Sequence, residues 1–165
     1  MQDPLPSADE LARMYALEPL PLEGGLFRRT WAGPQQPDGR PSGSAILLLL
    51  SADDGHFSAM HRLPRDEVWH FYLGDPVELL LLEPGGASRV EVLGGQVDAG
   101  EHVQYVVPGR TWMGARVRPG GERALLGCTM APGFVPADYE GGDEEDLCAR
   151  YPLHAELIRA LSRAS

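Results

Sequence analysis

The sequence predicts a mainly β fold, a jelly-roll barrel (double-stranded β-helix) with a short N-terminal helix and helices at the C-terminus. The first observation is composition, because 20 glycines and 15 prolines punctuate the chain at short intervals. That spacing is typical of all-β domains built from many short strands. The second is that strand-sized apolar or alternating runs follow one another from Ser44 to Met130. About eight or nine strands so closely spaced protect their edges by closing into a double-sheet jelly roll.

The strands are predicted in order from these runs. A turn-rich segment leads into a first strand at Leu26–Trp31, and the polar, proline-broken segment Gly33–Gly43 is predicted as a mobile surface loop. The almost purely apolar run Ala45–Leu50 is typical of a strand buried on both faces. The remaining strands, separated by turn signals, are predicted at His56–Leu63, Glu67–Leu73, Val77–Leu82, Arg89–Leu93, His102–Val107, Thr111–Arg116 and Ala124–Met130.

Helices are predicted at both ends of the chain. Ser7 and Glu10 form an S-x-x-E capping box, which predicts a helix over Ala8–Leu17. Near the C-terminus, Glu144–Arg150 and Leu153–Arg163 carry an apolar stripe with helical spacing. We expect this stripe to pack against the outside of the barrel.

Length and charge limit the classes of function. A chain of 165 residues suits one domain, with the barrel core at about 26–130 and the helical tail at about 143–163. The formal net charge of −10 argues against nucleic acid and anionic membranes as partners. There is no apolar run near the roughly 20 residues of a membrane span, and the N-terminal stretch does not resemble a signal peptide, so we expect a cytoplasmic protein. Cys128 and Cys148 lie outside any metal-binding or redox spacing.

The stretch His56–Gly74 is the densest in groups that carry chemistry. His61, Glu67 and Gly74 have the spacing of the first sequence motif of the cupins, but Leu63 stands where that motif has its second histidine. The second cupin motif places a histidine shortly after its proline and glycine. Here the segment Pro108–Met113 occupies that position, and Trp112 or Met113 replaces the histidine.

The whole chain also resembles one branch of that superfamily, the small single-domain proteins of unknown function called cupin family 5. The resemblance is carried by LEGG before the first strand, SAMHRLPRDEVWHFYLGDPVEL in the middle, VPGRTW after the hairpin, and GCTMAPGFVPADYE near the end. It implies a jelly roll that is usually a homodimer, and it brings no established reaction.

The metal expected of a cupin is only partly supported. An iron, manganese or nickel site of this kind needs about three histidines and a carboxylate, and this chain retains His61 and Glu67 alone. Met113 is a poor substitute, because a thioether is a soft ligand. His70 would need a β-bulge, since it alternates with Glu67 along a strand. We therefore expect a weakly bound divalent metal at most.

Without a metal, the same residues predict a pocket for a small molecule. His61 and Glu67 would form a desolvated acid/base pair in the barrel mouth. Its walls, and the other ligand-binding candidates, are predicted to be Trp69, His70, Phe71, Tyr72, Trp112 and Met113. His70 and Tyr72 share the opposite strand face, where a dimer interface or a covering helix is the alternative. The leading hypothesis is a small, partly apolar ligand, carbohydrate-like or bearing a carboxylate.

Other functions stay open from the sequence. One is a metal-independent sugar epimerase or isomerase, with His61 as base and Tyr72 or Tyr105 as acid. Another is a lyase or dioxygenase with a weakly held metal. A third is a non-catalytic protein in which Glu67 merely satisfies His61. We interpret Glu23, which precedes two glycines, as the start of a strand rather than a group reaching over the barrel mouth.

Overall fold

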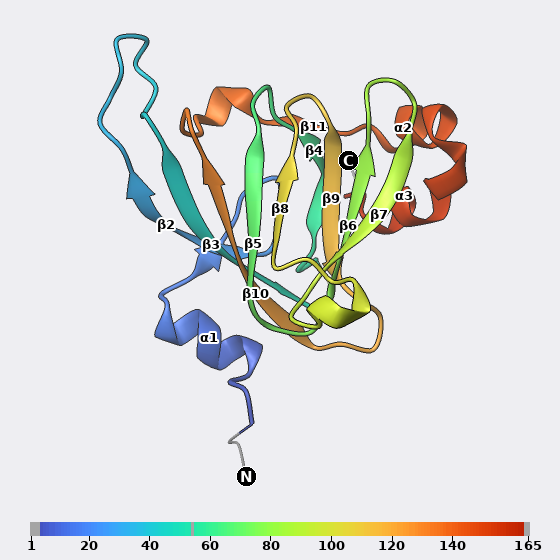
Figure 1. The fold of residues 1–165 in the computed structure, drawn as a ribbon, viewed down its shortest axis with the longest axis horizontal. Helices are drawn as coiled ribbons and strands as arrows, with labels where there is room; N and C mark the ends of the chain where they lie inside the picture. The colour runs from blue at the N-terminus through green and yellow to red at the C-terminus, as the bar shows by residue number, and fades with distance from the viewer. Residues whose placement is uncertain (1–3, 54, 164–165) are drawn as a thin grey trace.

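A computed structural model describes residues 4–53 and 55–163 and shows two antiparallel sheets that face each other (Figure 1). The six-stranded sheet has the order β1-β2-β3-β10-β5-β8, and the five-stranded sheet has the order β11-β4-β9-β6-β7. The predicted mainly β jelly roll with helices at both ends is therefore confirmed. The strands of the first sheet are β1 (Glu18–Pro19), β2 (Leu26–Ala32), β3 (Ser44–Ser51), β10 (Arg123–Met130), β5 (Glu67–Gly74) and β8 (Gln104–Val107). Those of the second are β11 (Glu140–Gly141), β4 (Ser58–Arg62), β9 (Trp112–Val117), β6 (Val77–Leu82) and β7 (Ser88–Leu93).

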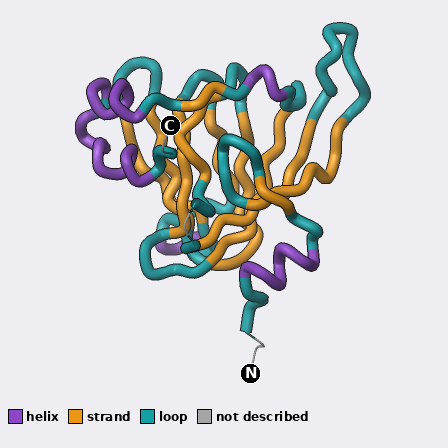
Figure 2. Tube along the Cα trace, turned by 180° about the vertical axis from the view of Figure 1, so that it is seen from behind, coloured by secondary structure: helices purple, strands orange, loops and turns teal. Residues whose placement is uncertain are grey.

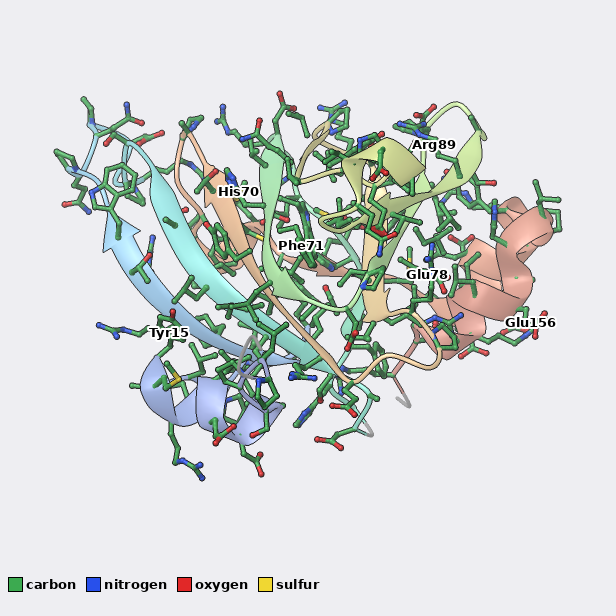
Figure 3. The ribbon with its side chains drawn as sticks, turned by 60° about the horizontal axis from the view of Figure 1, so that its bottom comes forward. Tyr15, His70, Phe71, Glu78, Arg89 and Glu156 are labelled. Atoms are coloured by element: carbon green, nitrogen blue, oxygen red, sulfur yellow. The ribbon has the colours of Figure 1, made fainter. Side chains whose placement is uncertain are left out.

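Alternate residues of both sheets fill the barrel between them. The largest apolar cluster contains Leu48, Trp69, Leu79 and Leu126, all at most 1 % exposed. The alternation along β5 follows the expected pattern, with Glu67 and Trp69 turned inward and His70, labelled in Figure 3, turned outward.

The N-terminal helix α1 (Ala8–Met14) begins with the predicted capping box, since Ser7 and Glu10 each accept a hydrogen bond from the other's backbone N–H. It ends earlier than expected. Leu11 packs with Leu49 and Leu125 on the outer face of β3 and β10. The helix therefore covers only one end of the six-stranded sheet (Figures 1 and 3).

The C-terminal helices cover the outer face of the other sheet, as predicted. α2 (Glu144–Arg150) has the expected bounds, but the second segment splits into a 3-10 turn, η3 (Pro152–His154), and α3 (Ala155–Ala160). Two further 3-10 turns are η1 (Val97–Ala99) and η2 (Pro136–Asp138). Figure 2 shows the C-terminal helices α2 and α3 (purple, at the left) outside the strands. Among the described helices, none combines the length and the apolar character that crossing a bilayer requires.

The Gly33–Gly43 segment, predicted as a mobile loop, is a structured extension of the β2–β3 hairpin (Figure 1). Gln35 and Pro41 form a β-bridge within it. Arg40 makes a two-pronged ion pair with Asp138, and the side chains of both are mostly buried. Such bidentate pairs hold their partners in a set geometry, so Arg40 anchors this mostly exposed surface segment to η2, and its mobility stays a prediction.

Candidate functional site

A cavity of about 290 Å³ opens at one end of the barrel. Most of its wall is apolar, and the polar side chains that line it are Glu23, Arg29, Ser44 and Glu67. Its remaining lining residues are Leu20, Phe27, Ile46, Leu63, Cys128, Met130, Phe134 and Pro136. An apolar hollow with a few convergent polar groups is the usual form of a small-molecule site.

Glu67 projects into this cavity from the first position of β5 and is 8 % exposed. Burial raises the pKa of its carboxyl to about 8, and the charge of Glu23 adds to that shift. Trp69 opposes the shift, but its buried indole N–H forms no hydrogen bond of ordinary geometry. At neutral pH Glu67 is therefore mainly a neutral carboxylic acid, able to donate a hydrogen bond.

His61 and Glu23 lie against each other, and two hydrogen bonds link them through the backbone of Ala59. The Ala59 N–H donates to the Glu23 carbonyl at 2.8 Å, and His61 Nδ1 donates to the Ala59 carbonyl at 2.7 Å. His61 Nε2 lies 3.2 Å from Glu23 Oε1. Since Nδ1 donates to the Ala59 carbonyl, Nε2 is the ring nitrogen that faces the Glu23 carboxyl, and the two side chains can form an ion pair only with a cationic imidazole.

The group that a ligand would meet is Glu23 rather than His61. His61 is 1 % exposed and does not line the cavity, whereas Glu23 does. The structure brings both His61 and Glu67 near Glu23, but among the described residues the predicted acid/base pair of His61 with Glu67 shows no direct hydrogen bond or ion pair, and Glu23 lies between the imidazole and the cavity.

Glu23 reaches this position through a tight turn, so its interpretation as the start of a strand was wrong. β2 begins at Leu26, and Gly24 and Gly25 take φ values of 101° and 75° that favour glycine. A Cβ on Gly24 would lie 2.5 Å from the Phe57 carbonyl oxygen. The paired glycines in LEGG were the available signal, since they mark a backbone that folds closely over its neighbours.

Two more residues complete the polar end of the site. The Tyr139 ring stacks on His61 with 5.3 Å between ring centroids. Burial raises the pKa of Tyr139 to about 12 and that of the Cys128 thiol well above its usual range, so both stay protonated. Neither had been predicted as part of the site.

Most predicted wall residues lie elsewhere. Trp69, Phe71 and Met113 face the barrel interior but do not line the cavity. The prediction that Trp112 forms part of the cavity wall was wrong. Its side chain faces outward on β9 and packs under the C-terminal helices, with the Arg62 guanidinium over its ring. Alternation along β9 is the reason, since Met113 turns inward and its neighbour must turn outward.

The predicted candidates on the opposite face of β5 also lie away from the cavity. His70 Nε2 is 2.8 Å from Thr129 Oγ1, and Tyr72 is 52 % exposed. Tyr105, the other proposed acid, accepts a hydrogen bond from Arg89 at 2.8 Å. Neither Tyr72 nor Tyr105 lines the cavity, so neither is placed to act as the acid of an epimerase.

The residues present do not fit the metal that cupins of the three-histidine type hold. Leu63 lines the cavity and Met113 pairs with His61 across β4 and β9, so both missing imidazoles are replaced by apolar side chains. His61 Nε2, its remaining free nitrogen, faces Glu23. Within residues 4–53 and 55–163, no three histidine, cysteine or acidic side chains come together in a geometry for metal binding.

Comparison with known proteins agrees with this fold. The family described as "Cupin superfamily (DUF985)" matches residues 9–141. The chain belongs to this cupin family. Protein SO0799 from Shewanella oneidensis has 33 % identity and a TM-score of 0.88, over 98 % of this chain and 100 % of that one. A hypothetical protein from Leishmania major has 27 % identity and a TM-score of 0.84, over 96 % and 100 % of the two chains.

More distant cupins share the fold alone. Oxalate decarboxylase from Bacillus subtilis has 14 % identity and a TM-score of 0.54, over 89 % of this chain and 38 % of that one. No curated protein matches the sequence. The family thus accounts for the architecture and leaves the activity to be inferred from the site.

Proposed function

We propose that this cupin binds a small, largely apolar molecule in the barrel cavity, with the polar end of that molecule directed at Glu67 and Glu23. The observation that carries the proposal is that a buried, protonatable carboxyl and a carboxylate held by His61 both line one apolar cavity of about 290 Å³. Buried polar groups without partners favour a ligand that supplies them. The apolar lining supports the hydrophobic part of the ligand.

Proton transfer on the bound molecule is a second candidate function. It is favoured by the two different environments of the carboxyl groups that line one cavity, because Glu23 lies beside the His61 imidazole and Glu67 is held neutral by burial. Pairs of groups driven apart in this way serve as base and acid. Glu23 would take the proton from the ligand, Glu67 would donate one, and His61 would position Glu23. The base would then be Glu23, and His61 would not touch the ligand.

The binding proposal is tested with a fragment library observed through methionine methyl NMR. Met130 lines the cavity, whereas Met14 is 65 % exposed on α1 and serves as an internal reference. We expect ligands to shift the Met130 methyl signal and not that of Met14. Ile46→Phe, which fills the cavity, should remove the shift, and Val106→Phe on the outer sheet face should keep it. Equal responses of both variants would contradict binding in the cavity.

Turnover is tested separately on any ligand so found. If the cavity exchanges protons with carbon, wild-type protein in D₂O should introduce deuterium into the ligand, and Glu23→Gln and Glu67→Gln should each slow this by about 10²-fold or more. If the wild-type protein binds the ligand but introduces no deuterium into it, the proton-transfer function is wrong and the binding function remains.

A further inference from the structure

Acidic groups outnumber basic groups at the end of the cavity where Glu67 and Glu23 lie. Glu67 approaches from β5 and Glu23 from the turn before β2, and the basic group beside them is His61, which lies behind Glu23. Arg29 also lines the cavity, but it is an exposed residue whose guanidinium donates to the Phe134 carbonyl at 3.2 Å. Its charge is therefore screened by solvent.

Among the described residues, Glu67 has no charged partner of opposite sign, and the neutral indole of Trp69 is the one group that lowers its pKa. Glu67 is more than nine-tenths buried, and within the described residues it forms no ion pair. The neighbouring Cys128 is a protonated thiol and supplies no charge. An unpaired carboxyl facing an enclosed apolar space is costly unless a donor or a cation occupies that space.

We propose, on the basis of the function proposed above, that the cavity binds a small amine with an apolar body, its ammonium group held between the carboxylates of Glu67 and Glu23. An ammonium supplies hydrogen-bond donors and a positive charge to both groups. The apolar body contacts side chains such as Leu20, Phe27 and Met130.

Other ligand classes suit this arrangement less well. A carboxylate would meet the charge of Glu23 and keep Glu67 from ionising. A neutral alcohol would hydrogen-bond to Glu67 but would leave its charged form unstabilised. The net charge of −10 also draws cations rather than anions toward the protein.

Binding of an ammonium group should release the proton that Glu67 holds in the free protein. Near neutral pH the free protein holds a proton on Glu67, and the bound cation stabilises the carboxylate instead. One proton therefore leaves Glu67 for solvent as the amine binds, while the amine stays charged because its own pKa is near 10. Below the pKa of Glu67, amine affinity should rise about tenfold per pH unit.

The test uses a matched set of probes: 3-methylbutylamine, 3-methylbutan-1-ol and 4-methylpentanoate. Calorimetry of the full chain at pH 6.5 and 7.5, in phosphate and in Hepes, measures affinity and the number of protons released. We expect the amine to bind about tenfold or more tighter than the alcohol at pH 7.5, to release about one proton, and to bind about tenfold more weakly at pH 6.5. The alcohol should show no such pH dependence, and the carboxylate should bind least.

Variants identify the group responsible. Glu67→Gln should abolish the proton release and the pH dependence of amine binding and leave alcohol binding within a few-fold. Glu78→Gln, on the outer side of the five-stranded sheet (Figure 3), is the matched control and should change nothing.

The outcomes separate this inference from the proposed function. If the alcohol or the carboxylate shifts Met130 and binds as tightly as the amine, the amine proposal is overturned and the binding function stands. If the fragment library yields cavity ligands and none is an amine, the amine proposal is again wrong. If neither the probes nor the library affects Met130, the proposed function itself is wrong.

Discussion

At the scale of single residues, Glu67 decides the polarity of the site. Its carboxyl is held in an apolar cavity beside a second carboxylate, and the structure offers it no basic partner among the described residues. Ionisation of a carboxyl buried in that position lowers the stability of the folded protein. The cost appears as a dependence of stability on pH.

Glu67→Gln tests this cost. The pKa of Glu67 is raised from its ordinary value of 4.5 to about 8 in the folded protein. At a pH between these two values, the folded protein keeps a proton on Glu67 and the unfolded chain does not. The free energy of unfolding should therefore fall as pH rises from about 5 to about 8, by about 1 kcal/mol per pH unit. Gln removes the titration, and the variant should lose this slope.

Urea unfolding at each pH measures both proteins, with the exposed Glu156→Gln as the control for an unrelated acid. The same slope in wild type and Glu67→Gln would show that Glu67 is not the group whose burial raises its pKa.

At the scale of elements, the turn from Leu20 to Gly25 builds the site. The Leu20 N–H donates to the Gly25 carbonyl at 3.0 Å, and the Gly24 N–H donates to the Leu20 carbonyl at 3.1 Å. Arg163, beyond the last helix, donates to the Glu23 carbonyl at 3.2 Å and stacks over Phe57. The C-terminal tail thus helps to hold the turn that carries Glu23 against β4.

Gly24→Ala should disrupt this turn. The residue has a φ of 101°, and its new Cβ would approach the Phe57 carbonyl oxygen within 2.5 Å. Gly120→Ala is a matched control, since its φ is 96° but nothing lies within 4 Å of the added Cβ. Both should lose about 1 kcal/mol to backbone strain. Gly24→Ala should lose roughly 1–3 kcal/mol more from crowding.

Thermal or urea unfolding gives the comparison, and the Met130 methyl signal reports whether the cavity changes. If the two alanine variants are equally stable, the close packing of the turn does not contribute to the fold.

At the scale of the whole molecule, the two sheets are covered unequally. The C-terminal helices cover the five-stranded sheet, while α1 covers only one end of the six-stranded sheet (Figures 1 and 2). The outer face of β5 and β8 keeps Tyr72 and Val106 about half exposed, beside the half-buried His70. An uncovered face of this kind, at the edge strand β8, is suited to pairing with a second copy.

We expect a homodimer, as the family resemblance implies. Light scattering at micromolar concentration should give twice the chain mass of 17.9 kDa. Replacing Tyr72 and Val106 together by Lys should shift the mass toward the monomer, while Leu153→Lys, on the exposed η3 turn, should not. A monomeric wild type would refute the dimer, and an unchanged mass of the double variant would place the interface elsewhere.

Local pattern was enough to predict most of the fold. Val77–Leu82 and Glu144–Arg150 have the bounds read from the sequence, and the Ser7–Glu10 capping box is present as expected. The inward direction of Glu67 also followed, because strand alternation depends only on neighbouring residues. These features share one physical basis, since each depends on groups a few residues apart.

The rest was decided by tertiary structure. The contact of Glu23 with His61 joins segments far apart in the chain, and the turn that makes it is oriented by Ala59 and Arg163. Whether Trp112 or Met113 faces the barrel depended on the register of β9 against β4 and β6. The sequence by itself determined a jelly roll with His61 and Glu67 among its candidate polar groups. Only the packing of distant segments decided that Glu23 meets the cavity, because alternation sets which way a side chain points but not what covers it.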